Sequence, residues 1–394
     1  MSDSLISRSE DLRRLRDEGF ELAIVNSQLV ISHVPYVTAN RTVEYGTLVS
    51  ELTLAGDVTT TPSTHVVRFA GQMPCDAEGR PLEKLVLGSD QLQVAEGITT
   101  SYMFSSKPVP PLFYTDYHDK MTTYAAALSG HAESLVPTAT ARTYRPIPAT
   151  VEGVFEYLDT ATSRSGTTAV GECLRSRSVG IIGLGGTGAY ILDFLAKTPA
   201  EEIHLFDPDR FLQHNAFRAP GAATLDQLRE QSLKVTYFVD RYRSMHRAIV
   251  PHPVAIEEHN LGLLDDMSFV FIAIDHGPAK RPIMEHLEQR GIPFIDVGMG
   301  VSVEEGRVAG LVRATLSTDR PGSREAARAR ISTEDVALGE YNTNIQIAEL
   351  NALNAATAVI MYKKQIGFYA DTGGAHFSTY IVDSNDNINE DGTE

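Results

Sequence analysis

Four polar residues that follow one another closely near the middle of the chain could bind a nucleotide. The segment Phe206-Asp-Pro-Asp-Arg-Phe-Leu-Gln-His-Asn-Ala-Phe-Arg218 contains Asp207, Asp209, Asn215 and Arg218. A carboxylate at the end of a strand can accept hydrogen bonds from ribose hydroxyls. An Arg that turns back over the phosphates can stabilise charge on a transferring phosphoryl group. These residue types favour ATP over a nicotinamide cofactor, which has no clear use for the second Asp, the Asn and the Arg.

A glycine-rich turn lies upstream of this segment and could bind the phosphates. Its G-x-G-x-x-G spacing permits a tight turn, a close approach of backbone amides to phosphate, and close packing of the following helix on the strand. The helix, expected from about Thr187 to Lys197, points its positive N-terminal end at the anion. The turn alone does not distinguish NAD from ATP. The predicted phosphate-binding glycines are Gly183, Gly185, Gly186 and Gly188.

A further carboxylate, Asp275, ends the apolar run that begins at Phe269. At the C-terminal tip of a parallel strand it would lie on the ligand side of the sheet. The alternative interpretation is an Asp that caps the following helix.

The elements that must position these residues alternate between strands and helices. Alternation of this kind predicts an α/β fold with a mainly parallel sheet and right-handed crossovers, whose ligands bind beyond the carboxyl ends of the strands. The expected strands are Ser178–Ile182, Ile203–Phe206, Phe269–Ile274, Phe294–Val297 and Arg307–Thr315.

A change in composition predicts two domains. Residues 136–148 are rich in Pro, Thr and Ala, which suits an extended linker. Before it, short β-like runs and a helix expected over Tyr114–Ala132 predict a smaller α+β domain, residues 1–148. The α/β domain then spans residues 149–383, and residues 384–394 form an acidic tail that we expect to be solvated or disordered.

Composition excludes several classes of function. The formal net charge of -17 disfavours a nucleic-acid binder, which needs a basic surface. No apolar stretch approaches the length of a membrane span, and the N-terminus has no apolar signal-peptide core. Two cysteines are too few for a disulfide framework or a zinc site built on paired cysteines. We therefore expect a cytoplasmic protein that binds neither nucleic acid nor membrane.

The motif Asp207-x-Asp209, with Asn215 and Arg218, resembles the D-x-D…N-x-x-R signature of the ThiF, MoeB and ubiquitin-activating enzyme superfamily. The resemblance covers roughly residues 155–383. It implies a Rossmann-like adenylation domain that uses ATP and Mg²⁺ to adenylate the C-terminal glycine of a ubiquitin-like or sulfur-carrier protein. A conjugating enzyme is a possible further partner.

The resemblance also implies roles for individual residues. Asp207 would bind the ribose, and Asn215 and Arg218 would contact the triphosphate. Lys234 would reach the phosphates, although it could instead be an ordinary helix-surface Lys. Asp275 would bind Mg²⁺, an ion that prefers oxygen ligands. Family members often have Asp-Asn at this position, whereas this chain has Asp-His, so the detail of this loop differs.

In homodimeric members of the family an Arg just before the first strand reaches the partner's γ-phosphate. Arg164 is the candidate for this role, and Arg145 is a less favoured substitute. The apolar segment Asn344–Tyr362 predicts a long buried helix that could lie at a twofold interface. Packing of this helix in the core without dimerisation is the alternative.

The cysteines do not predict a thioester. Enzymes of the superfamily that form one use a Cys after the magnesium-binding Asp, and this chain has none after Cys173. Cys75 is followed by Asp76, which would raise the pKa of its thiol. The reaction could end at the acyl-adenylate, pass to a partner's nucleophile, or use a hydroxyl of this chain.

The N-terminal domain resembles an uncharacterised domain found before ThiF-like domains. Its expected role is recognition of the ubiquitin-like protein or of a conjugating partner. His65 and His118 could be ligands or bases, and we expect them to be structural instead. Three rival functions stay open: an NAD-dependent oxidoreductase, a non-catalytic ThiF-like scaffold, and activation of a small-molecule or tRNA group.

Overall fold

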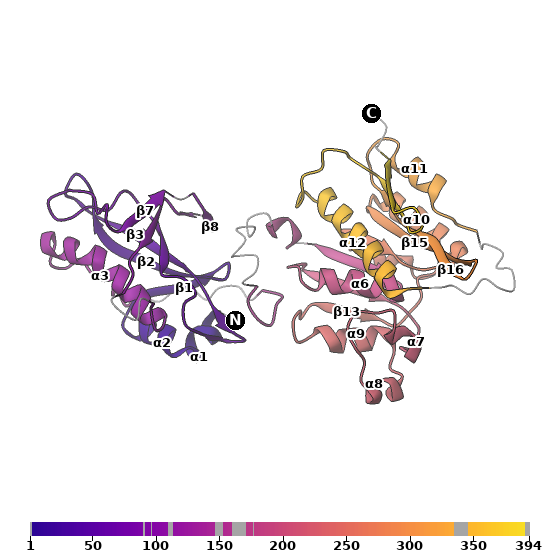
Figure 1. The fold of residues 1–394 in the computed structure, drawn as a ribbon, viewed down its shortest axis with the longest axis horizontal. Helices are drawn as coiled ribbons and strands as arrows, with labels where there is room; N and C mark the ends of the chain where they lie inside the picture. The colour runs from indigo at the N-terminus through magenta and orange to yellow at the C-terminus, as the bar shows by residue number, and fades with distance from the viewer. Residues whose placement is uncertain are drawn as a thin grey trace. The chain divides into compact units, whose positions relative to one another are not determined.

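The computed structural model describes residues 2–89, 91–95, 97–108, 113–145, 153–159, 171–175, 177–334 and 346–390 (Figure 1). The chain divides into two compact units, Met1–Ala169 and Val170–Glu394. The boundary predicted after residue 148 therefore falls inside the first unit.

The first unit is an antiparallel sheet with helices. Its sheet has the strand order β1-β2-β3-β6-β10-β7, and two short hairpins, β4-β5 and β8-β9, accompany it. Its elements are α1 (Ser2–Arg8), α2 (Glu10–Asp17), β1 (Glu21–Val25), β2 (Gln28–Val37), β3 (Val43–Glu51), β4 (Leu54–Ala55), β5 (Val58–Thr59), β6 (Val66–Ala70), β7 (Val86–Ser89), β8 (Gln93–Ala95), β9 (Ile98–Thr99), β10 (Tyr102–Ser105) and α3 (Tyr117–Leu135).

The long helix α3 packs on this sheet. Its N-cap is Asp116, whose side chain accepts a hydrogen bond from the backbone N–H of Asp119 at 2.7 Å. Its buried face meets aromatic residues of the sheet, where the rings of Phe69 and Phe104 stack at 5.0 Å. The helix predicted over Tyr114–Ala132 is confirmed with a small shift of its ends.

The segment predicted as a linker belongs in part to the first unit. Ala139 and Ala141 are buried, and the backbone N–H of Tyr144 donates to the carbonyl of Gly19 at 3.0 Å. The prediction of an extended linker from residue 136 was wrong for these residues. Ala139 packs with Ala132 of α3 and Val37 of β2, and composition alone does not reveal such packing.

A buried lysine of α3 is expected to make the stability of the first unit depend on pH. The Nζ of Lys120 donates to the Oγ of Ser50 at 2.9 Å and is completely buried. Burial lowers the pKa of Lys120 to about 8. Because the unfolded chain keeps an ordinary lysine pKa, we expect stability to rise between about pH 8 and pH 10.5. The gain corresponds to roughly 3 kcal/mol for a shift of this size.

Urea unfolding of the full chain between pH 7 and pH 9.5 tests this expectation. The variant Lys120→Met should be more stable than the wild type at pH 7 and should lose the rise with pH. The exposed Lys107→Met serves as the matched control and should keep it. Equal pH slopes in wild type and Lys120→Met would contradict the assignment.

The second unit is a twisted sheet with the order β13-β12-β11-β14-β15-β16-β17-β18. The first five strands in this order are parallel, and the last three add antiparallel. The predicted fold class is confirmed. The strands are β11 (Ser178–Ile182), β12 (Glu202–Phe206), β13 (Ile249–His252), β14 (Phe269–Ile272), β15 (Phe294–Glu304), β16 (Arg307–Ser317), β17 (Phe377–Ile381) and β18 (Asp386–Glu390).

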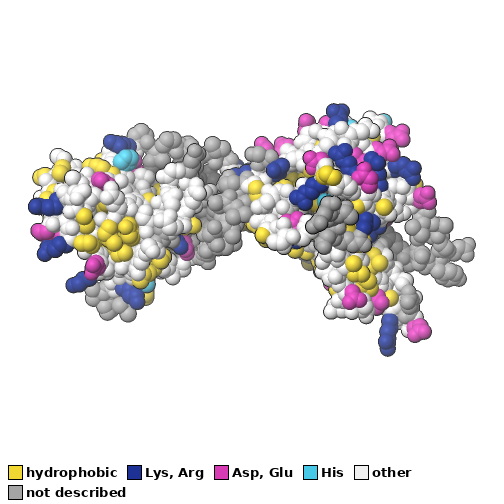
Figure 2. Space-filling view, turned by 90° about the horizontal axis from the view of Figure 1, so that it is seen from above, with side chains coloured by type: hydrophobic (Ala, Val, Ile, Leu, Met, Phe, Trp, Pro, Cys, Tyr) yellow, Lys and Arg dark blue, Asp and Glu magenta, His cyan; other side chains and the backbone are white. Residues whose placement is uncertain are grey.

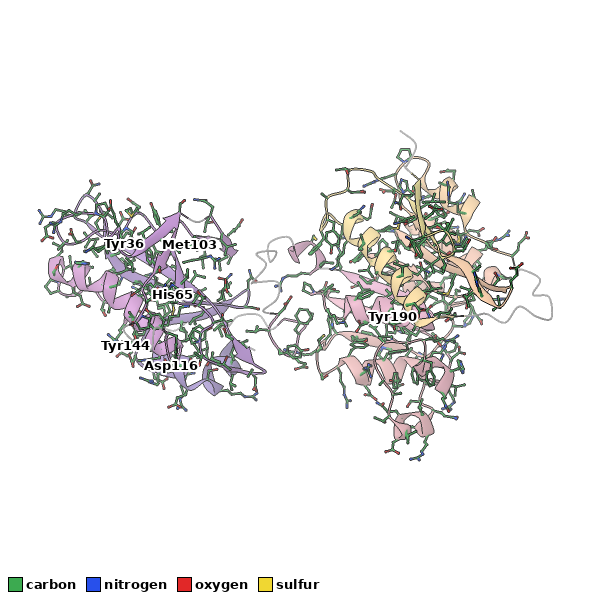
Figure 3. The ribbon with its side chains drawn as sticks, in the orientation of Figure 1. Tyr36, His65, Met103, Asp116, Tyr144 and Tyr190 are labelled. Atoms are coloured by element: carbon green, nitrogen blue, oxygen red, sulfur yellow. The ribbon has the colours of Figure 1, made fainter. Side chains whose placement is uncertain are left out.

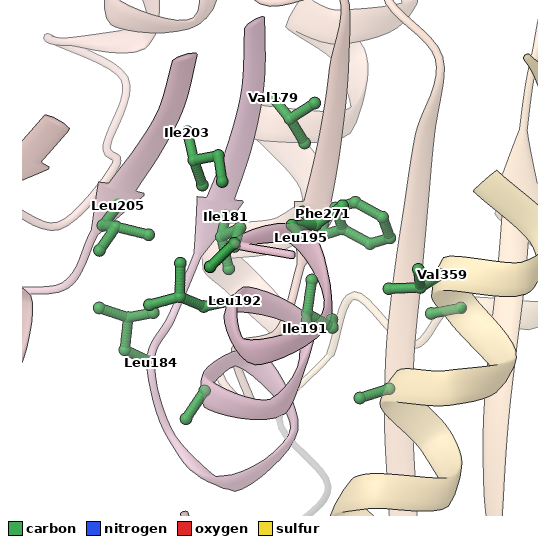
Figure 4. Close-up of a cluster of buried hydrophobic side chains, with 14 of the residues drawn as sticks. Val179, Ile181, Leu184, Ile191, Leu192, Leu195, Ile203, Leu205, Phe271 and Val359 are labelled. Carbon is green, nitrogen blue, oxygen red and sulfur yellow. The ribbon is translucent and has the colours of Figure 1, made fainter. Parts of the chain in front are cut away.

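Helices cover both faces of this sheet. Side chains of α6, α9 and α12 pack with the sheet in one core, and those of α10 and α11 pack on the other face. Figure 4 shows Ile181 of β11, Leu192 of α6 and Val359 of α12 within the first of these cores. The helices are η1 (Glu172–Leu174), α6 (Gly186–Leu195), α7 (Gln213–Ala216), α8 (Leu225–Glu230), α9 (Lys234–Tyr242), η2 (Leu261–Leu264), α10 (Gly277–Arg290), α11 (Ser323–Arg330) and α12 (Ala348–Gln365).

The C-terminal end differs from the expected disordered tail. Asp386–Glu390 forms β18, which pairs with β17. Acidic residues suit an exposed edge strand because charge discourages pairing with another chain.

The described surface carries mixed charge. On the face drawn in Figure 2, Lys and Arg side chains are interspersed with Asp and Glu over the second unit. This visible face therefore lacks the continuous basic stripe that nucleic-acid binders present. Among the helices described, none is long and apolar enough to cross a bilayer.

Candidate functional site

The glycine turn joins β11 to α6 in a conformation that requires glycine. Gly183 has a φ of +91°, and a Cβ at this position would lie 2.5 Å from the carbonyl oxygen of Ala273. A Cβ on Gly188 would lie 1.9 Å from the carbonyl oxygen of Gly183. The turn is therefore as tight, and the helix as close to the strand, as the glycine spacing predicts.

The carboxylate of Asp207 lies directly beside this turn. Its Oδ2 accepts a hydrogen bond from the backbone N–H of Leu184 at 2.7 Å, and its Oδ1 accepts from the backbone N–H of Asp209 at 2.9 Å. Asp207 is buried at the end of β12. The structure thus brings together the glycine turn and the predicted ribose ligand.

Lys234 begins α9 and is paired with both carboxylates. Its Nζ lies 3.2 Å from Oδ2 of Asp207 and 2.8 Å from Oδ2 of Asp209. Its backbone N–H donates to the carbonyl of Asp209 at 2.8 Å. Lys234 is buried, so the interpretation as an ordinary surface lysine is wrong. The ammonium group of Lys234 therefore lies between the carboxylates of Asp207 and Asp209.

Two buried donors of the segment that follows Asp209 have no acceptor among the described residues. The Oδ1 of Asn215 accepts from the backbone N–H of Leu212 at 2.8 Å, but its Nδ2 is buried without a hydrogen-bond partner among the described residues. The Nε of Arg218 is buried and likewise lacks an acceptor in that part of the chain. An unsatisfied buried donor costs about 1–3 kcal/mol, so both groups are suited to a ligand or water that supplies acceptors.

Asp275 is exposed and follows β14, on the same edge of the sheet as the turn. Its Oδ2 accepts a hydrogen bond from Nε2 of Gln346 at 3.2 Å, and Oε1 of Gln346 accepts from the backbone N–H of Gly186 at 3.2 Å. Within the described ranges, no group of three or more His, Cys, Asp and Glu could hold a metal ion. One carboxylate suits Mg²⁺ only if phosphates and water supply its other ligands, as is usual for this ion.

Amide side chains from α12 connect the separate parts of the site. Oδ1 of Asn351 accepts from the hydroxyl of Thr187 at 2.9 Å, and its Nδ2 donates to the carbonyl of Arg218 at 3.4 Å. A Cβ on Gly186 would lie 1.9 Å from Nδ2 of Asn351, so Gly186 lets α12 approach α6. Sequence reasoning missed Gln346 and Asn351, because nothing local indicates that they face the glycine turn.

A buried charged cluster lies on the strand next to Asp275. The carboxylate of Asp296, in β15, is completely buried, 2.6 Å from Nζ of Lys280 and 3.4 Å from a guanidinium nitrogen of Arg313. Burial raises the pKa of Asp296, and the charges of Lys280 and Arg313 act in the opposite direction. Sequence reasoning missed this cluster as well. An Asp inside the apolar run Phe294–Val297 was the available signal.

The helix predicted over Asn344–Tyr362 is α12, which begins at Ala348. It packs in the core of its own unit, against α6 and the sheet, with Ala355 and Ala358 completely buried. Core packing thus accounts for its apolar inner face. Leu353 and Ile360 lie on its exposed side, and a role in dimerisation stays a prediction.

The arginine-finger assignments stay predictions. Arg164 lies outside the described residues. Arg145 lies in the first unit, where a guanidinium nitrogen is 3.9 Å from a carboxylate oxygen of Glu21 and 3.3 Å from Nε2 of His33.

The surroundings of both cysteines disfavour the thiolate form. Cys75 is buried, and burial together with the nearby Asp76 charge raises the pKa of its thiol. Burial also raises the pKa of the Cys173 thiol. The thiolate population of both is therefore reduced.

Two histidines of the first unit, His65 and His118, make side-chain hydrogen bonds. His65, labelled in Figure 3, lies 3.1 Å from the Oγ of Ser105, and Nε2 of His118 lies 2.6 Å from a carboxylate oxygen of Glu18. These contacts are those expected of histidines with a structural role.

A model of the ThiF family matches residues 163–367, and a model of a domain of unknown function, DUF6791, matches residues 10–160. No curated protein matches the chain. Similar solved structures include E. coli MccB with MccA-N7isoASN, at 17% identity, 58% coverage of this chain, 71% of that chain and a TM-score of 0.46. E. coli MccB with ATP has 16% identity, 59% and 71% coverage, and a TM-score of 0.47. PaaA has 16% identity, 78% and 97% coverage, and a TM-score of 0.48.

Proposed function

Because the chain belongs to the ThiF family of ATP-dependent adenylyltransferases, we propose that it adenylates the C-terminal carboxylate of a ubiquitin-like or sulfur-carrier protein. The carboxylate attacks the α-phosphate of ATP, an acyl-adenylate forms, and pyrophosphate leaves. No side chain acts as a nucleophile in this step, so positioning and charge neutralisation supply the rate enhancement.

The two buried donors without acceptors are the observation that carries the proposal. Nδ2 of Asn215 and Nε of Arg218 gain acceptors when the phosphates of ATP lie beside the glycine turn. A nicotinamide dinucleotide also carries phosphates, but the family match and the Lys at the base of the site favour a triphosphate. An NAD-dependent oxidoreductase is therefore the weaker alternative, and ATP binding without NAD binding would dispose of it.

Each charged residue has a role in this proposal. Lys234 leaves the two carboxylates for the phosphates, which frees lone pairs on Asp207 for the ribose hydroxyls. Asp209 holds Lys234 before the nucleotide arrives. Asp275 holds Mg²⁺, which neutralises phosphate charge when bound. Arg164 of a second copy is the proposed finger on the γ-phosphate, in a homodimer.

The thiols of this chain do not favour a covalent thioester intermediate. The chain has no Cys after Cys173, and Cys75 is buried with a raised pKa. We therefore propose that the acyl group passes to a nucleophile of a partner, such as a conjugating enzyme. The first unit would recognise the carrier or that partner.

Exchange between ATP and labelled pyrophosphate tests the proposed function. The wild-type chain with candidate β-grasp proteins should catalyse Mg²⁺-dependent exchange. A carrier that ends in a C-terminal amide is the matched control, since it keeps the binding surface but lacks the attacking carboxylate. ATP hydrolysis to ADP and phosphate, without exchange, would contradict an adenylyltransferase.

A further inference from the structure

The side chain of Gln346 bridges the two parts of the site that the nucleotide is expected to join. It accepts from the backbone N–H of Gly186 at 3.2 Å and donates to Oδ2 of Asp275 at 3.2 Å. These partners lie 160 and 71 positions away in the sequence. One amide therefore spans the gap between the glycine turn and the carboxylate proposed to hold Mg²⁺.

The oxygen of this amide lies where an anion would be favoured. Gly186 is the first residue of α6, and the N–H groups at a helix N-terminus have no partners within the helix and carry positive partial charge. A phosphate oxygen is a stronger acceptor for such a group than a neutral amide oxygen. The Gly186 N–H is therefore bound by a weaker substitute for phosphate.

The nitrogen of the same amide donates to Asp275, the carboxylate proposed to hold Mg²⁺. A hydrogen bond from Nε2 to Oδ2 of Asp275 uses a carboxylate lone pair that a metal ion would take. Both the hydrogen bond and Mg²⁺ draw on the negative charge of this oxygen, so Gln346 and the metal ion weaken each other's interaction with Asp275.

We propose that Gln346 is an internal competitor of ATP–Mg²⁺, which stands in for a phosphate oxygen on Gly186 and for the metal on Asp275 until the nucleotide displaces it. This inference rests on the proposed function, because it needs a nucleotide in this site. Gln346 lies two residues before Ala348, the first residue of α12, so its release couples nucleotide binding to the start of that helix. Asn351, one turn into α12, keeps its contacts with Thr187 and the Arg218 carbonyl.

Binding of ATP to the full-length protein, measured by calorimetry with and without Mg²⁺, tests the proposal. Removing both hydrogen bonds in Gln346→Ala should tighten ATP–Mg²⁺ binding by about five- to tenfold, since each bond contributes modestly to the free state. Gln346→Met keeps the length of the side chain and should show the same gain. Gln365→Ala removes the same group at the other end of α12 and should bind like the wild type.

Each outcome decides between the alternatives. Equal affinity in wild type and Gln346→Ala overturns the competition, and weaker binding in the variant shows that Gln346 is a direct ligand of the nucleotide instead. Tighter ATP binding in Gln346→Ala but not in Gln346→Met would overturn the role of the hydrogen bonds, because the size of the side chain would then explain the gain. Absence of ATP binding in the wild type would overturn the proposed function itself. Failure of the proposed function can therefore be told apart from failure of the proposal on Gln346.

Discussion

Replacing Arg218 by Ala is expected to slow ATP–pyrophosphate exchange by about two to three orders of magnitude, the usual effect of removing a donor that stabilises transition-state charge. The Nε of this guanidinium is buried and has no acceptor within the described part of the chain. A donor held in this way pays its desolvation cost before the substrate arrives. It is then available for the charge that develops on the phosphoryl group.

The loss should be mainly in kcat, since the interaction strengthens in the transition state. Arg218→Lys keeps the charge but not the planar fork of donors, so only part of the activity should return. Arg229→Ala on α8 is the matched control, because that side chain is exposed and pairs only locally with Asp226. Exchange within a few-fold of wild type in Arg218→Ala would rule out the assigned role.

Local signals predicted the skeleton of the site. The apolar run of β11 is followed by Gly183, and those of β12 and β14 lead to Asp207 and Asp275. Because the carboxyl ends of parallel strands lie at one edge of a sheet, the sequence alone places these three residues at that edge. The helix that follows the glycines was also predictable. These features depend on residues close together in the sequence, where the period of the side chains determines the element.

The residues that sequence reasoning missed depend on contacts between distant segments. Gln346 and Asn351 face the glycine turn only because α12 packs across α6. The strand β13 was missed for a local reason, since Pro251 lowers the strand signal of Ile249–His252. Pro is tolerated there because β13 is the edge strand of the sheet.

The buried pair of Lys280 and Asp296 also joins segments that are not adjacent in the sequence, and sequence reasoning missed it. Lys280 lies in α10, the helix that follows Asp275, and its partner lies in the neighbouring strand β15. A buried ion pair of this kind fixes the start of α10 against the sheet. Asp296→Leu leaves Lys280 buried without its carboxylate, and we expect the second unit to lose about 3–5 kcal/mol of stability.

The double variant Asp296→Leu with Lys280→Met separates charge from packing. Replacing both members of a buried pair by apolar side chains is often neutral. Arg313 also loses Asp296 but is partly exposed and still donates to the carbonyl of Arg330, so the double variant should recover most of the stability lost in the single one. Urea unfolding of the full chain measures both effects. If the pair also positions Asp275, the recovered double variant should still need more Mg²⁺ for ATP binding than the wild type does. Recovery of stability together with an unchanged Mg²⁺ dependence would assign the pair to stability alone.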